Sequence, residues 1–177
     1  MKALFLGDSI TEGFDLEKYF PGRSFVNHGI SGFSSAELLE AMHEGWFANH
    51  PQWVFLCIGT NDLARDYQQT KSLDNILHLV HKIRLFSPPG VNICIASLFP
   101  TRHNPPRKNA VIDQLNLELH RLTHDEKIHY LHLNPFFKDD NGQLKREFTD
   151  DGLHLNQLAY KLWAEFIQLL TGPFMDK

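Results

Sequence analysis

The 177-residue sequence has few cysteines and no long hydrophobic run. Its two cysteines, Cys57 and Cys94, are too far apart for a CxxC metal or redox motif, and each lies in an apolar run, which predicts small buried side chains. No apolar run approaches the roughly 20 residues of a transmembrane helix. The apolar run at the N-terminus is too short for a signal-peptide core. We therefore expect a cytoplasmic protein without a membrane span.

An excess of positive charge is also missing. The chain has 17 Lys and Arg against 21 Asp and Glu, a formal net charge of −4, and its basic residues are scattered. A nucleic-acid partner is therefore not expected. Hydrophobic residues make up 42% of the chain, as in ordinary globular proteins, and neither an internal repeat nor a low-complexity linker interrupts it. This composition predicts a single domain over residues 1–177 and leaves the oligomeric state open.

Short apolar runs alternate with longer segments of helical periodicity. Strands are expected at residues 3–6, 24–29, 53–58, 91–98 and 128–133. Helices are expected from a Ser34–Glu37 capping box through Phe47 until Pro51, and at residues 70–86, 109–123 and 157–170. Strands that alternate with helices are typical of right-handed βαβ units with helices on both faces of a parallel sheet. The sequence thus predicts an α/β fold, a three-layer α/β/α sandwich around a five-stranded parallel sheet.

Glycine and polar residues follow three of the expected strands. The segments are Gly7-Asp8-Ser9, Asn27-His28-Gly29-Ile30-Ser31-Gly32 and Gly59-Thr60-Asn61-Asp62. Because parallel strands share their carboxyl edge, we expect these loops to lie together, where open α/β sheets bind ligands. Ser9 is a candidate nucleophile if a base activates it. The backbone N–H groups of Ser9 and Gly32 and the side-chain amide of Asn61 could bind an oxyanion.

The candidate base stands far along the chain. Asp151 and His154 are three residues apart, just before the last expected helix. A turn there would bring the carboxylate to one imidazole nitrogen and leave the other for Ser9. At about 3.3 Å per extended residue, the chain after the fifth strand is long enough to reach Ser9. Asp150 is the alternative carboxylate, and activity should fall at acidic pH as His154 is protonated.

These blocks resemble those of the SGNH hydrolases, also called GDSL esterases or lipases. The matching residues are Gly7-Asp8-Ser9-Ile10, Gly32, Gly59-Thr60-Asn61-Asp62 and Asp151-Gly152-Leu153-His154, with isoleucine at the position of the family's leucine. The resemblance implies a flavodoxin-like sheet of order 2-1-3-4-5 and ester hydrolysis without a metal or cofactor. It implies Ser9 as nucleophile, Asp151 and His154 as acid and base, and Ser9, Gly32 and Asn61 as oxyanion donors.

The expected partner is a small-molecule ester. The chain offers no long apolar lid, so short acyl groups are favoured, for example the acetyl esters of a carbohydrate or another small alcohol. A lysophospholipase or thioesterase of the same family is the alternative. The segment Phe99–Arg107 follows the fourth strand and is either a wall of the substrate pocket or a stiff connector. His28 and His103 could reach the rim of the cleft, but a plain surface position is favoured for both.

Other classes of protein explain fewer residues. An α/β-hydrolase needs a G-x-S-x-G motif, and no serine of the chain lies in one. A flavodoxin-like binding protein could hold a phosphate with Ser9 and Thr11 at a helix start, but that reading leaves Asn61 and the Asp151–His154 pair unexplained. An inactive relative that only binds glycans would not need all of these side chains.

Overall fold

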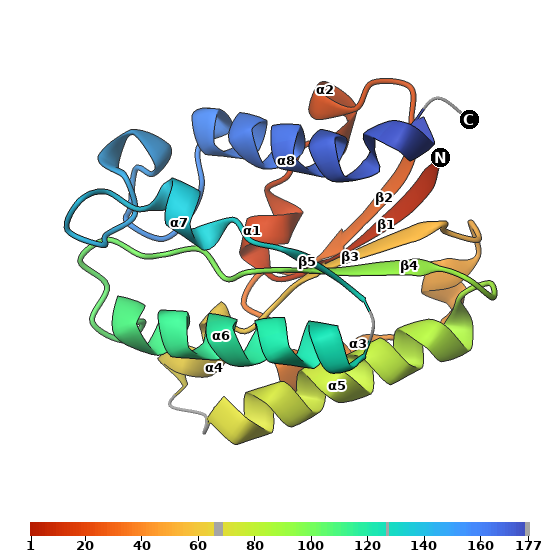
Figure 1. Ribbon diagram of the computed structural model, residues 1–177, viewed down its shortest axis with the longest axis horizontal. Coiled ribbons are helices and arrows are strands. Elements are labelled where there is room, and N and C mark those ends of the chain that lie inside the picture. The colour runs from red at the N-terminus through yellow and green to blue at the C-terminus, as the bar shows by residue number, and fades with distance from the viewer. Residues whose placement is uncertain (66–68, 127, 176–177) are drawn as a thin grey trace.

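The computed structural model describes residues 1–65, 69–126 and 128–175. Within these residues a five-stranded sheet lies between two layers of helices (Figure 1). Its strands are β1 (Lys2–Gly7), β2 (Ser24–Gly29), β3 (Trp53–Cys57), β4 (Asn92–Ala96) and β5 (His129–Leu131). All neighbours pair in parallel in the order β2-β1-β3-β4-β5, which confirms the predicted sheet and its strand order.

Helices cover both faces of the sheet, as Figure 1 shows. One face carries α2 (Leu16–Tyr19) and α8 (Gln157–Met175), and the other carries α3 (Ser35–Ala41), α4 (Thr60–Ala64), α5 (Gln69–Phe86) and α6 (Asn109–Asp125). The remaining helical segments are short: α1 (Ser9–Glu12), α7 (Asn134–Phe137), and the 3₁₀ helices η1 (Glu44–Phe47) and η2 (Arg146–Phe148). No described helix is both long and apolar enough to span a membrane.

Two cores of different character hold the layers, because successive strand side chains point to opposite faces. The core under α8 is aromatic, with Phe5 stacked on Phe55 and Phe14 stacked on Trp163, each at 4.7 Å between ring centroids. The opposite core is mainly aliphatic and includes Leu4, Leu6, Val54, Leu56, Leu38, Ile76, Val80, Ile112 and Leu115. Aromatic ring packing therefore holds helix α8 against this face of the sheet.

Two predictions about local structure had different outcomes. The capping box is present, because Ser34 Oγ accepts from the Glu37 N–H while the Glu37 carboxylate accepts from the Ser34 N–H. The continuous helix expected through Phe47 is wrong, because the backbone is extended at Met42 (φ −62°, ψ 128°) and a separate η1 follows. Gly45 disfavours a helix interior, and its N–H is instead capped by His43 Nδ1 at 3.2 Å.

The structure also differs from the predicted boundaries at other elements. The short helices α4 and α7 and the 3₁₀ helix η2 were not predicted, and each has only three to five residues. Such segments are too short for a periodic apolar pattern to be recognised. Both cysteines are buried and free, as predicted, and burial raises the pKa of each thiol, so both stay protonated at neutral pH.

Two glycines at the strand ends allow α1 to lie directly on the sheet. A Cβ added at Gly29 would lie 2.1 Å from the Glu12 backbone nitrogen, and one at Gly7 would lie 2.1 Å from Thr11 Oγ1, so both would meet atoms of α1. The Glu12 nitrogen is a main-chain atom, which cannot rotate away as a side chain would. The position of α1, and of Ser9 at its start, therefore requires glycine, which has no side chain, at positions 7 and 29.

We expect Gly29→Ala to lower the free energy of unfolding by about 1–3 kcal/mol, the usual range for overpacking. Urea denaturation of the variant and the wild type measures the change. Gly172→Ala is the matched control, because a Cβ there meets nothing within 4 Å and alanine is the better helix former. A Gly29→Ala protein as stable as the wild type would contradict the close approach.

Candidate active site

Ser9 is the first residue of α1, directly after Asp8, which follows the interior strand β1. Asp8 caps this helix, because its Oδ1 accepts from the Ile10 N–H at 3.0 Å. Because Asp8 supplies the cap, the Ser9 hydroxyl is not used for capping. Ser9 Oγ lies 3.1 Å from His154 Nε2. The local sequence thus places a serine hydroxyl at the carboxyl edge of the sheet, with a ring nitrogen in hydrogen-bond range.

Asp151 and His154 reach this edge on the turn between η2 and α8. His154 Nδ1 lies 2.6 Å from Asp151 Oδ2. The other carboxylate oxygen, Oδ1, accepts from the backbone N–H groups of Leu153 and His154, both at 2.8 Å. The structure therefore aligns Ser9, His154 and Asp151 in one hydrogen-bonded chain. Asp151, rather than the alternative Asp150, makes the contact with the ring.

The environment of Asp151 keeps its carboxyl ionised. Partial burial acts to raise its pKa, but the hydrogen bonds from the His154 ring and from the backbone of Leu153 and His154 outweigh it and lower the pKa to about 2. At neutral pH the group is therefore a carboxylate. Such a carboxylate holds the imidazole in one orientation and stabilises its cation when Nε2 takes up a proton.

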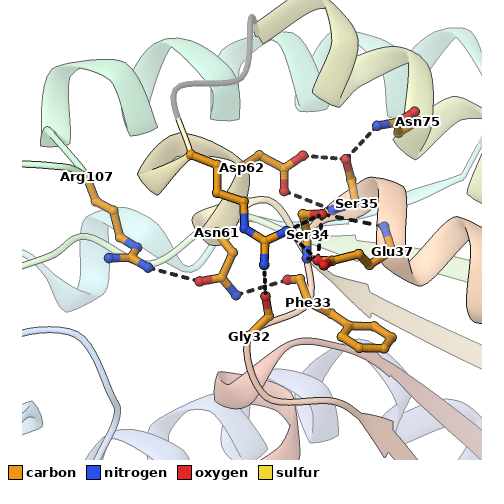
Figure 2. A network of polar contacts seen from close by, with 10 residues as sticks. Gly32, Phe33, Ser34, Ser35, Glu37, Asn61, Asp62, Asn75 and Arg107 are labelled. Atoms are coloured by element: carbon orange, nitrogen blue, oxygen red, sulfur yellow. Dashed lines mark hydrogen bonds and ion pairs between the residues drawn. The ribbon is translucent and has the colours of Figure 1, made fainter.

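The two other predicted residues lie on adjoining loops. Gly32 follows β2 with a φ of +80°, a conformation that favours glycine. Asn61 lies in the first turn of α4, and its Nδ2 donates to the Phe33 carbonyl at 2.9 Å. Asn61 Oδ1 accepts from Arg107 Nη2, also at 2.9 Å (Figure 2). The Asn61 side chain thus joins the first turn of α4 to the loop that carries Gly32 and Phe33.

A polar network, buried at Asp62 and Ser35, holds the segments that carry Gly32 and Asn61 (Figure 2). Asp62 is fully buried and accepts from both the backbone N–H and the hydroxyl of Ser35, and Asn75 Nδ2 donates to that hydroxyl at 3.0 Å. Arg65 donates to the Gly32 carbonyl at 3.0 Å and pairs with Glu37 at 2.6 Å. The network ties α3, α4 and α5 to the carboxyl edge.

The segment Phe99–Arg107, which sequence alone left open between a pocket wall and a connector, borders two cavities. One of about 440 Å³ is lined by Arg102, His103, Arg146, Thr149, Asp150, Asp151 and Gly152. The other, of about 460 Å³, is lined by Thr101, His103, Asn104, Pro105, Arg107, Lys108, Asn109 and Gln143. His103 is exposed and lines both, whereas His28 is half-buried and stacks on Trp46 at 4.7 Å.

Arg65 was not predicted to lie beside the site, and Arg107 was predicted only as the end of a segment that could line the substrate pocket. Their contacts are made across 33 and 46 residues of chain, with Gly32 and Asn61 respectively. The one available signal for Arg107 was its place in a loop that follows a strand of the same sheet edge. In the part of the chain that the structure describes, no group of three or more His, Cys, Asp or Glu side chains could hold a metal ion.

Asp8 carries a perturbed carboxyl next to Ser9. Burial raises its pKa from 3.8 to about 7, and the nearby Asp62 also acts to raise it, while the Ile10 N–H acts to lower it. Between these two pH values the unfolded chain has lost the proton that the folded protein still holds. Stability therefore falls as the pH rises from about 4 to about 7, and this contribution is constant above that range.

We expect Asp8→Asn to remove this part of the pH dependence, because an amide keeps the cap but does not ionise. Urea denaturation of both proteins between pH 4 and pH 8 should show the variant gaining stability relative to the wild type as the pH rises. Asp150→Asn, at an exposed position, is the control and should follow the wild-type profile. Parallel profiles for Asp8→Asn and the wild type would contradict a raised Asp8 pKa.

Comparison with known sequences places this geometry in a family. The model of the GDSL-like Lipase/Acylhydrolase family matches residues 5–162. An N-acylneuraminate cytidylyltransferase of Streptococcus agalactiae is 29% identical over 168 residues, which cover 95% of this chain and 38% of that protein, so the chain spans less than half of its length. The thioesterase 1/protease 1/lysophospholipase L1 of Escherichia coli K12 is 23% identical over 186 residues, with 98% and 84% covered.

Solved structures share the same architecture. A GDSL-like lipase from Bacteroides thetaiotaomicron superposes with a TM-score of 0.85 at 22% identity, over 97% of this chain and 88% of that one. An acetylxylan esterase from Geobacillus stearothermophilus gives 0.76 at 20% identity, over 97% and 94%. These two likenesses concern the fold. The match over residues 5–162 confirms the resemblance found in the sequence: the chain belongs to the GDSL-like lipase/acylhydrolase family.

Proposed function

We propose that this protein is a serine esterase that removes short acyl groups through an acyl-enzyme on Ser9. The observation that carries the proposal is the hydrogen-bonded chain from Ser9 Oγ through His154 to Asp151. A serine hydroxyl is a weak nucleophile until a neighbouring base accepts its proton. His154 Nε2, at 3.1 Å, is within reach of that proton.

The first half of the reaction forms the acyl-enzyme. His154 Nε2 takes the proton of Ser9 Oγ while Oγ attacks the ester carbonyl carbon. Negative charge develops on the carbonyl oxygen and is bound by the N–H groups of Ser9 and Gly32 and by the amide of Asn61. When the tetrahedral intermediate collapses, the carbon–oxygen bond to the alcohol breaks and His154 protonates the leaving oxygen.

The second half releases the acid. A water molecule attacks the acyl-enzyme, and His154 takes one of its protons. The bond to Ser9 Oγ then breaks, and the proton returns from His154 to that oxygen, so the enzyme is regenerated. Asp151 remains a carboxylate throughout, because its lowered pKa lies far below neutral pH. Its role is to orient the ring and to stabilise the imidazolium that forms twice in each cycle.

The substrate that fits best is a short-chain ester of a polar alcohol, such as an acetylated carbohydrate. A cavity beside Asp151, whose lining includes neither Ser9 nor His154, carries arginine, histidine, aspartate and threonine side chains, which suit the hydroxyl groups of a polar alcohol. Two of the related proteins carry names that refer to carbohydrates, an acetylxylan esterase and an N-acylneuraminate cytidylyltransferase. The thioesterase and lysophospholipase name of the E. coli relative supports the alternative, a longer acyl chain.

We expect Ser9→Ala to lower kcat for p-nitrophenyl acetate by at least about 10³-fold, because no other group can form the acyl-enzyme. Steady-state hydrolysis measures the loss, and unchanged thermal unfolding shows that the variant is folded. The control is Ser24→Ala, which changes an exposed serine at the start of β2, at the edge of the sheet away from Ser9. This variant should keep wild-type turnover. A Ser9→Ala protein that retains turnover would rule out this nucleophile, and a wild type that binds phosphate but hydrolyses no ester would favour the phosphate-binding interpretation.

The acyl preference is tested with p-nitrophenyl esters of increasing chain length. We expect kcat/KM to be highest for acetate and to fall as the chain lengthens, since the sequence offers no long apolar lid to cover an acyl chain. Acetylated xylose, O-acetylated N-acylneuraminate, a lysophospholipid and an acyl thioester are compared under the same conditions, with Ser9→Ala as the blank. A maximum at a long chain, or faster cleavage of the lysophospholipid or thioester, would contradict the short-chain proposal and leave the Ser9 mechanism intact.

A further inference from the structure

Arg107 lies against the back of the Asn61 side chain (Figure 2). Its Nη2 donates to Asn61 Oδ1 at 2.9 Å, and its Nε donates to the Thr60 carbonyl at 3.0 Å. The loop that carries it is itself fixed, because Thr101 Oγ1 donates to the Arg107 carbonyl at 2.7 Å. The half-buried guanidinium therefore donates hydrogen bonds to two successive residues at the start of α4, Thr60 and Asn61.

The two partners of Asn61 permit only one orientation of its amide. Arg107 can only donate, and the Phe33 carbonyl can only accept, so Oδ1 must face the arginine and Nδ2 must face the carbonyl. A flipped amide would place NH₂ against the guanidinium and oxygen against oxygen. In the observed orientation one N–H is used by Phe33, which leaves the second N–H of Nδ2 for an oxyanion.

The charge of Arg107 adds to this orientation. Hydrogen bonds from a charged donor are about twice as strong as neutral ones. Burial acts to lower the pKa of the guanidinium while the nearby Asp8 acts to raise it, and arginine stays protonated in proteins at any working pH. A positive donor on Oδ1 polarises the amide and makes its remaining N–H a stronger donor, because linked hydrogen bonds reinforce one another.

We propose that Arg107 is a positioning residue of the oxyanion hole, which holds the amide of Asn61 with its remaining N–H toward the developing oxyanion. Arg107 acts through Asn61 and does not itself touch the reacting atoms. The inference rests on the proposed esterase function and extends it to a residue of the loop after β4. It also gives that loop a role in the chemical step besides lining the cavities.

The test is a double-mutant cycle of Arg107→Met and Asn61→Ala, with kcat and KM measured on p-nitrophenyl acetate. We expect Asn61→Ala to lower kcat by about 10²–10³-fold and Arg107→Met by about 10–100-fold, with KM little changed, since the oxyanion forms only in the transition state. In the Asn61→Ala background, Arg107→Met should leave kcat nearly unchanged. Arg107→Lys should retain more of kcat than Arg107→Met, because an ammonium group can still donate to Oδ1.

The controls separate positioning from folding. Arg121→Met removes an exposed arginine that pairs with Glu118 and should leave kcat at the wild-type value. Thermal unfolding is recorded for each variant, and Arg107→Lys replaces Arg107→Met in the cycle if the methionine protein does not fold. An equal loss of kcat in both Asn61 backgrounds would overturn the positioning role while the esterase function stands. A wild type without Ser9-dependent esterase activity would instead overturn the proposed function, and this inference with it.

Discussion

The packing of α8 against α1 decides whether Ser9 and His154 can meet. These residues are 145 positions apart, and His154 lies in the turn that leads into α8. Tyr160 of that helix stacks on Phe14 at 5.4 Å and donates its hydroxyl to the Ile10 carbonyl at 2.7 Å. This buried bond joins the helix that follows His154 to the helix that begins with Ser9, so the geometry of the Ser9–His154 pair depends on the aromatic core.

The site is assembled from both helical layers. His154 and Asp151 come from the segment that precedes α8, on the aromatic side of the sheet. Gly32 and Asn61 are tied to α3, α4 and α5 on the aliphatic side, through the buried contacts of Asp62 and its neighbours. Ser9 stands at the end of β1, between the two. Strand β1 therefore leads directly to the residue that both layers must reach, and Gly7 and Gly29 allow α1 to approach the sheet.

Much of this arrangement could be predicted because it follows from local pattern and strand polarity. Alternating apolar runs indicated the parallel sheet, and three loops at strand ends indicated the shared edge that carries Ser9, Gly32 and Asn61. The break after Met42 could not be predicted, because the periodic apolar spacing continues across it and only Gly45 opposes a helix. Arg107 could not be assigned either, since an arginine in a proline-containing loop gives no sign of which distant amide it will contact.

The loop after β4 is anchored at both ends to different parts of the site. Near its start, the Arg102 N–H donates to the Gly152 carbonyl at 2.7 Å, in the turn that carries His154. At its far end Arg107 contacts Asn61. The residues between them, 103–106, are mostly exposed. A protein built in this way can change the middle of one loop during evolution, and so change what the cavities beside that loop accept, while His154 and Asn61 keep their positions.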